Sequence, residues 1–187
     1  MLKGSLVNLR AVEPDDYRLL WQWTNDPDVM VYWGRPGNSQ SLPEVARLEE
    51  LQAARGTSRK YIVETVEALP IGQIDYYDLD WQARSAWTSI MIANQEFWGG
   101  GYGTDSMRTL LTYLFTQIGL HRVSLAAHVT NKRAIRSYEK NGFKVEGTLR
   151  EWAFFNGAWV DGVLMSVLES DFMQLRSEAS TPAGSGA

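Results

Sequence analysis

Residues 96–129, EFWGGGYGTDSMRTLLTYLFTQIGLHRVSLAAHV, contain the pattern that decides the fold. Glycine occupies positions 99, 100, 101 and 103, and apolar residues then recur every three or four positions from Met107 to Ile118. That spacing predicts a helix, which Gly119 ends. Residues 122–129 form a strand-like apolar run, and the β-rich run 87–93 precedes the glycines. We therefore expect a βαβ unit with two parallel strands and a glycine-rich loop before its helix.

The segments on either side add further strands and helices to this unit. Ser41 with Glu44 three residues later is typical of a helix N-terminus, and Gly56 marks the end of that helix. Asn156-Gly157 is a strong hairpin signal. We expect strands at 6–10, 61–65, 71–77, 144–155 and 159–168, the second and third forming an antiparallel meander with 87–93, and helices at 13–23, 42–55 and 131–140. This order predicts an α+β (mixed α/β) fold, in which helices cover a mixed sheet.

Length and composition favour one soluble domain. The chain has 187 residues, and we expect a single domain over 1–176 followed by a flexible tail of small polar residues over 177–187. No apolar run is long enough for a signal peptide or a membrane span, so we expect a cytoplasmic protein without a membrane partner. The net charge of −4 makes a nucleic-acid partner unfavourable. The absence of cysteine excludes disulfides, Cys-ligated zinc and a cysteine acyl-enzyme.

The glycine-rich loop is suited to a pyrophosphate, because backbone N–H groups meet the positive end of the helix dipole there. A tight turn without a ligand is the alternative interpretation. A dinucleotide fingerprint would need a third glycine where Thr104 stands, and no Gly-Lys-Ser or Gly-Lys-Thr follows for a Walker A motif. NAD and ATP are therefore disfavoured.

Several segments resemble one family. EFWGGGYGT at 96–104, NKRAIRSYEKNGF at 131–143 and the continuation KVEGTLRE look like the GNAT superfamily of acetyl-CoA-dependent N-acetyltransferases. The opening segment LRAVEPDDYRLLWQWTNDPDVMVYW and the closing FFNGAWVDGVLMSVLESDF are similar to its RimJ/RimL and spermidine acetyltransferase branch. The resemblance implies a central, mostly antiparallel sheet that is splayed at the acetyl-CoA site, with helices on both faces.

The resemblance also implies a set of site residues. Acetyl-CoA would be the cosubstrate, with its pyrophosphate on the loop 98–104 and its pantetheine arm along the strand edge 90–92. Trp98 stands where the family pattern has Gln or Arg. Asn131 would hold the cofactor arm, and Tyr138 would be the general acid toward the departing thiolate. The residues alone also allow structural roles, because Asn131 is a good helix N-cap and Tyr138 continues an apolar stripe of the same helix. The implied cofactor-binding residues are Ile90, Met91, Ile92, Trp98, Gly99, Gly100, Gly101, Tyr102, Gly103, Thr104, Asn131, Ala134 and Tyr138. No His or Cys cluster indicates a metal.

The base and the amine acceptor stay open at this point. Glu96 beside the loop is the first candidate for a second catalytic residue, with Asp75, Asp78, His128 or water as alternatives. The branch implies Trp33, Asp75 and Tyr77 as substrate-binding residues.

Direct transfer in a ternary complex follows from the lack of a nucleophile for an acyl-enzyme. The acceptor could be a protein N-terminus, a polyamine, an aminoglycoside or another small amine, and a non-catalytic acyl-CoA-binding module is the rival hypothesis. The segment Gly34-Arg35-Pro36-Gly37 is basic if anything, which disfavours a polyamine.

The closing strand 159–168 predicts an association. Its residues are apolar on both faces, whereas a strand that ends a sheet normally carries polar residues on its open side. We therefore expect a second surface to cover it, either a helix of the same chain or another copy of the protein. Because symmetric dimers are the commonest oligomers, a homodimer is the expected assembly.

Overall fold

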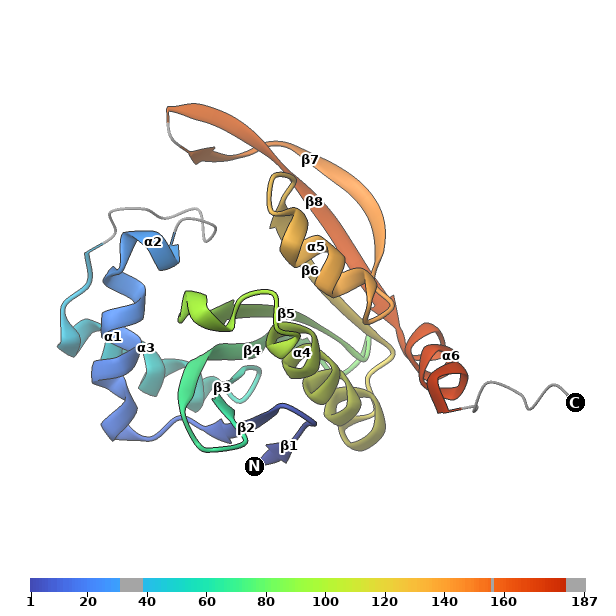
Figure 1. Cartoon of the computed structure of the whole chain (residues 1–187), viewed down its shortest axis with the longest axis horizontal. Helices are drawn as coiled ribbons and strands as arrows, with labels where there is room; N and C mark the ends of the chain where they lie inside the picture. The colour runs from blue at the N-terminus through green and yellow to red at the C-terminus, as the bar shows by residue number, and fades with distance from the viewer. Residues whose placement is uncertain (31–38, 156, 181–187) are drawn as a thin grey trace, which may run out of the picture.

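The computed structural model describes residues 1–30, 39–155 and 157–180 (Figure 1). Its helical segments are η1 (Pro14–Asp16), α1 (Tyr17–Asn25), α2 (Pro27–Met30), α3 (Leu42–Arg55), η2 (Gln95–Phe97), α4 (Tyr102–Tyr113), the π-helical turn η3 (Leu114–Ile118), α5 (Lys132–Glu139) and α6 (Glu169–Ser180). Its strands are β1 (Leu2–Lys3), β2 (Val7–Ala11), β3 (Arg59–Thr65), β4 (Pro70–Asp80), β5 (Ser85–Ile92), β6 (Arg122–His128), β7 (Lys144–Phe155) and β8 (Ala158–Leu168).

The described strands form one mixed sheet in the order β1-β2-β3-β4-β5-β6-β8-β7. Neighbours are antiparallel except β5 and β6, which are parallel as the βαβ unit requires. The predicted meander is β3, β4 and β5, and the predicted hairpin is β7 and β8. The hairpin extends well beyond the rest of the sheet (Figure 1).

Helices cover both faces of the sheet, as expected. Successive strand residues point to opposite faces, and Ile62 and Val63 of β3 accordingly belong to different apolar clusters. Ile62 packs with Leu20 of α1 and Val45 of α3. Val63 belongs to the large core that also holds the apolar side of α4, together with Tyr138 of α5 and Phe172 of α6. The faces therefore carry α1–α3 on one side and α4–α6 on the other.

The sheet splits between β5 and β6. Their ladder consists of three pairs, Ser85 with Arg122, Ala86 with Val123 and Trp87 with Ser124. Beyond Trp87 the two strands diverge, and residues of both then line a common cavity. The splayed sheet predicted for an acetyl-CoA site is therefore present.

Polar contacts fix α4 and α5 around this split. Asp105, buried in the first turn of α4, accepts bonds from the N–H groups of Leu6 at 2.7 Å and Val7 at 3.2 Å. The hydroxyls of Thr104 and Ser137 lie 2.9 Å apart. Buried Asn141 donates from Nδ2 to the carbonyls of Thr104 and Ser137 at 3.1 and 3.0 Å. The start of α4 is thus tied to β2 on one side and to α5 on the other.

The structure corrects the prediction that 159–168 ends the sheet. β8 lies between β6 and β7, and its buried Val163, Met165 and Val167 belong to the large core. Its central position pairs both edges of β8, and its own chain buries the face with these three residues, whereas Val160, Leu164 and Leu168 on the other face are half-buried. The edge strand on this side of the sheet is β7, and β1 is the edge strand on the other. At the C-terminus, α6 extends to Ser180 and includes the first residues of the expected tail, whereas 181–187 lie outside the described residues.

Candidate active site

A cavity of about 920 Å³ passes from one face of the sheet to the other at the split. Its lining includes the start of α4 and the inner side of α5 on one face, and α2, α3 and the meander on the other. The predicted site residues that line it are Asp75, Tyr77, Ile90, Met91, Ile92, Trp98, Gly99, Gly101, Gly103, Thr104, Asn131, Ala134 and Tyr138, together with the alternative bases Asp78 and His128. Residues far apart in the sequence therefore share one continuous space.

The glycine-rich loop forms the phosphate-compatible end of the cavity. Gly101 is the N-cap of α4 with φ +90° and offers no capping side chain. The N–H groups of the first helical turn have no partner within a helix, so they can bind an anion. A Cβ at Gly103 would lie 3.7 Å from Ile92 Cγ1 and 4.0 Å from Ser137 Oγ, in the gap between β5 and α5. Three cations of α5 or its C-cap, Arg133, Arg136 and Lys140, line this end. These donors fit the diphosphate of CoA.

The edge of β5 is open along the split. Residues 88–92 have no ladder partner in β6, which leaves strand-like backbone groups for an extended ligand. One of these groups is already used, because Trp98 Nε1 donates to the carbonyl of Ile92 at 2.8 Å. Trp98 thus closes the end of the open edge nearest the loop.

Tyr138 lies on the α5 side of the cavity. Its side chain is 7% exposed and its ring lies 5.8 Å from that of Phe143. Burial raises the pKa of Tyr138 to about 12, so the hydroxyl stays protonated at physiological pH. Asn131 caps the same helix by accepting from the N–H of Ala134 at 3.2 Å. Asn131 therefore has the structural role of an N-cap as well as a place in the cavity lining.

The opposite end of the cavity lies under α2 and α3. Lys60, Asp75 and Ser89 are register partners across β3, β4 and β5, and so share a face. Asp75 Oδ1 accepts from the N–H and the hydroxyl of Ser89 at 3.1 and 2.5 Å. Burial raises the pKa of Asp75, although the Ser89 hydrogen bond and the charge of Lys60 oppose the shift. Glu49 of α3 is ion-paired with Lys60.

This end is lined by the cations Arg55, Arg59 and Lys60 as well as by carboxylates, and two further features suit a cationic ligand with an apolar stem. Asp75 and Asp78 form no ion pair with any described residue. Gln73, two residues before Asp75, lines the cavity, and its buried Oε1 has no hydrogen-bond partner within the described residues. Apolar Val29, Met30 and Met91 lie alongside.

Comparison with known proteins agrees with this geometry. The family model "Acetyltransferase (GNAT) domain" matches residues 7–144. The chain belongs to the GNAT acetyltransferase family. It is 32% identical over 175 residues to the spermidine N(1)-acetyltransferase of Vibrio cholerae serotype O1, covering 94% of this chain and 99% of that protein. It is 26% identical over 156 residues to the aminoglycoside N(6')-acetyltransferase type 1 of Klebsiella pneumoniae, covering 76% of each chain.

A solved structure agrees as well. The spermidine N-acetyltransferase from Vibrio cholerae in complex with CoA and spermine superposes with a TM-score of 0.84 at 30% identity, covering 91% of this chain and 99% of that one. The chain is therefore an acetyl-CoA-dependent N-acetyltransferase.

Not every predicted residue of this GNAT acetyltransferase lies at the cavity. Glu96 is exposed on η2, and neither it nor Gly100 or Tyr102 is part of the described lining. The Tyr102 ring instead packs edge-on against Phe97 with centroids 5.0 Å apart. Trp33 and the segment 34–37 lie outside the described residues. Among the described residues, no group of His, Asp and Glu could hold a metal ion, and no helix is long and apolar enough to cross a membrane.

Sequence reasoning missed one wall of the GNAT cavity, Trp152. Three residues of β7, 150–152, bulge out where β8 has only Asp161, and Glu151 adopts φ +51°. The bulge places the Trp152 ring 5.3 Å from His128 and directly over Gly162, where a Cβ would lie 2.7 Å from the ring. Gly162 inside a predicted strand was the available signal, because a strand glycine often marks a close approach. Burial lowers the pKa of His128, so its imidazole is neutral at physiological pH.

Proposed function

We propose that the enzyme acetylates a primary amine of a small polyamine, bound with the reacting nitrogen near Asp75. The observation that supports this is the position of Asp75. A half-buried carboxylate without an ion pair among the described residues lies at the cavity end opposite the glycine loop. Apolar walls beside it suit a methylene chain. The relatives from Vibrio cholerae are named spermidine acetyltransferases, and spermidine is a polyamine.

The proposed reaction is a direct transfer. The amine nitrogen bonds to the acetyl carbon as the carbon–sulfur bond of the thioester breaks. Asp75 accepts the proton that the ammonium must lose, and Tyr138 donates its proton to the departing sulfur. An aliphatic amine with a pKa near 10.4 costs about 4 to 5 kcal/mol to deprotonate at pH 7, so a carboxylate with a raised pKa is the better matched acceptor. Glu96 is a less suitable base, because it is exposed and away from the described lining.

The remaining roles are part of the same proposal. The loop 98–104 binds the diphosphate of CoA, the edge 90–92 pairs with the pantetheine arm, and Asn131 and Ala134 lie beside it. Tyr77 forms a wall of the acceptor end. We also propose a cytoplasmic location, and a homodimer formed through the exposed side chains Val145, Phe154 and Trp159 of the β7–β8 hairpin.

A panel of amines tests the acceptor. Thiol release from acetyl-CoA would be measured with spermidine, spermine, n-butylamine, an aminoglycoside and an N-terminal peptide of the type RimJ/RimL enzymes acetylate. We expect kcat/KM for spermidine to exceed that for n-butylamine at least about tenfold, because a second ammonium adds a charge-assisted contact. A preference for the peptide or the aminoglycoside would overturn the polyamine proposal, and CoA binding without turnover on the whole panel would favour the non-catalytic alternative.

A further inference from the structure

The side chain of Trp98 is committed to the protein and cannot itself bind a phosphate. Its Nε1, the only hydrogen-bonding group of an indole, donates to the Ile92 carbonyl at 2.8 Å. The family pattern has Gln or Arg at this position, both of which offer several donors. A side-chain contact to a phosphate beside this loop therefore requires a donor from another residue.

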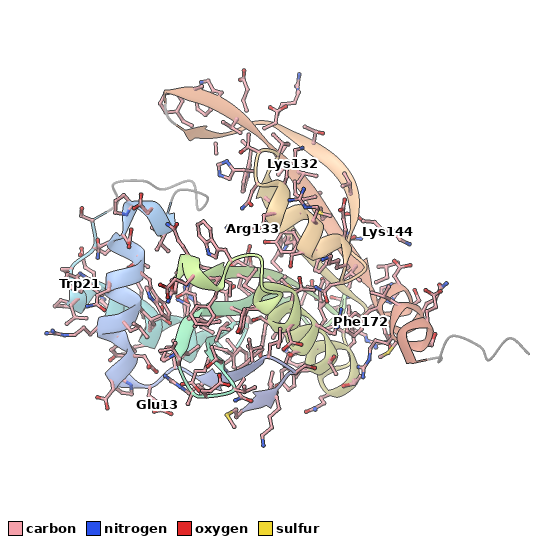
Figure 2. All side chains as sticks on the ribbon, viewed as in Figure 1. Glu13, Trp21, Lys132, Arg133, Lys144 and Phe172 are labelled. Carbon is pink, nitrogen blue, oxygen red and sulfur yellow. The ribbon has the colours of Figure 1, made fainter. Side chains whose placement is uncertain are left out.

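Arg133 lies on the indole face of Trp98. Its Cζ is 3.5 Å from the ring centroid, well within the range of a cation–π contact. Arg133 belongs to α5 and lies between that helix and the segment leading into α4 (Figure 2). The contact joins the loop before α4 to α5 in the region where Gly99, Gly101 and Gly103 also line the cavity.

Stacking leaves the guanidinium well oriented for an anion. The indole contacts the flat face of the group, whereas its five N–H donors lie in its plane along the edges. Planar paired donors match the geometry of phosphate oxygens, and a stacked guanidinium has less rotational freedom to lose on binding. The hydrogen bond from Trp98 Nε1 to the Ile92 carbonyl holds the indole ring in place, and the stacking contact orients the Arg133 guanidinium on that ring.

We propose that Arg133, held on the Trp98 ring, makes a side-chain contact to a phosphate of CoA. Arg133 binds the phosphate, and Trp98 is a positioning residue that acts through it. The inference rests on the proposed placement of the diphosphate on the glycine loop. The ligand chemistry is a phosphate oxyanion, which in CoA belongs either to the diphosphate or to the 3′-phosphate.

Calorimetric dissociation constants for three ligands test the proposal. CoA carries both phosphate groups, 3′-dephospho-CoA keeps only the diphosphate, and pantetheine carries none. We expect Arg133→Gln to weaken CoA binding about tenfold or more and to leave pantetheine binding unchanged. An equal loss for 3′-dephospho-CoA assigns Arg133 to the diphosphate, and no loss for it assigns Arg133 to the 3′-phosphate. Lys132→Gln is the matched control, because Lys132 is an exposed cation one residue away and outside the described lining.

The role of Trp98 is tested by non-additivity. We expect Trp98→Leu to weaken CoA binding as Arg133→Gln does, and Trp98→Leu combined with Arg133→Gln to be no weaker than Arg133→Gln alone. Trp98→Phe keeps an aromatic face without the Nε1 bond and should lose less. Trp98→Gln combined with Arg133→Gln should regain part of the affinity by restoring the family side chain.

Three results would overturn the proposal. The first is that Arg133→Gln binds CoA as well as Lys132→Gln does, and the second is that Arg133→Gln also weakens pantetheine binding. The third is that the double variant Trp98→Leu, Arg133→Gln loses CoA affinity by the product of the two single losses. Circular dichroism of each variant confirms that the fold is kept. Gly103→Val distinguishes the role of Arg133 from the proposed placement of the CoA diphosphate on the glycine loop. If Gly103→Val leaves CoA binding intact, the loop placement is wrong, whereas a weakened Gly103→Val beside an unaffected Arg133→Gln rejects only the role of Arg133.

Discussion

Asp75 combines three properties that a general base for an amine needs. It lines the cavity, Ser89 orients one of its oxygens through two hydrogen bonds, and burial raises its pKa above the usual carboxyl value. A raised pKa means that the ionised form is less favourable in the folded than in the unfolded protein. The stability that Asp75 contributes is therefore complete below its unfolded pKa of about 3.9 and is lost as the pH rises through the folded value.

Asp75→Asn tests this at the residue scale. The amide oxygen can keep the Ser89 hydrogen bonds, so the fold is retained, but the negative charge is lost. We expect kcat/KM for the acceptor to fall about 10²-fold or more, and the acid limb of its pH profile to disappear. We also expect the melting temperature of the variant relative to wild type to be higher at pH 7 than at pH 3, because only ionised Asp75 destabilises the fold. Unchanged acceptor kinetics would exclude Asp75 as the base.

Tyr138→Phe is the second test at this scale. With a pKa of about 12, the hydroxyl keeps its proton throughout the working range, and the burial that raises this pKa also disfavours a thiolate beside it. We expect the variant to bind CoA like wild type and to lose about 10²- to 10⁴-fold in kcat, measured by steady-state thiol release. Turnover equal to wild type would reduce Tyr138 to a core ring packed on Phe143.

At the scale of elements, the site exists because β5 pairs with β6 for only three residues and then separates. α4 starts at the split, and Thr104, Ser137 and Asn141 hold its N-terminus against α5. The glycines of the loop differ in what they tolerate. Gly101 has φ +90°, so any side chain there strains the backbone, whereas Gly103 lies outside the left-handed region and has room for a Cβ.

Gly103→Val is therefore the sharper test of the loop. The added methyl groups would project into the gap between Ile92 and Ser137 without backbone strain. We expect the fold to persist and CoA affinity to fall strongly in calorimetry, because the helix N-terminus becomes less accessible. Gly147→Val on β7, where nothing lies within 4 Å of an added Cβ, is the matched control and should bind CoA normally. Equal affinities of the two variants would reject the loop as the phosphate site.

At the scale of the whole molecule, the tip of the β7–β8 hairpin projects beyond the rest of the sheet (Figure 1). β7 is an edge strand, and its tip region carries Phe154 at 55% exposure and Trp159 of β8 at 61%. The two rings contact each other with centroids 5.2 Å apart. An exposed aromatic pair on an unpaired strand edge is a surface that a second copy of the chain could cover.

The dimer proposal is tested by light scattering after size exclusion. We expect a mass twice the chain mass of 21.1 kDa for wild type and a shift toward the monomer for Trp159→Ser. Trp81→Ser is the control, because Trp81 is similarly exposed, at 62%, but lies in the turn between β4 and β5 and not on the β7–β8 hairpin. A wild-type mass near that of one chain at all concentrations would remove the proposal.

The sequence by itself determined the features that depend on neighbouring residues. The Ser41–Glu44 capping box, the αL ends at Gly56 and Gly119, and the Asn131 cap are all present where the local pattern predicts them. The long amphipathic run was predicted as a helix, although its last turn is π-helical. β1, α2 and α6 were not predicted, because a two-residue strand, a single helical turn and a weakly amphipathic C-terminal segment leave little periodicity.

Only the tertiary structure decided which residues form the site. It separated Glu96 from the described cavity and placed Asp75 and Gln73 under α3, since burial of a strand residue depends on what packs against its face. It also placed β8 between β6 and β7, whereas the sequence pattern predicted that this strand ends the sheet. The Trp98–Arg133 stack and the Trp152 ring over Gly162 join residues that are 10 to 35 positions apart. Local spacing cannot encode such contacts, because they arise from how distant segments pack.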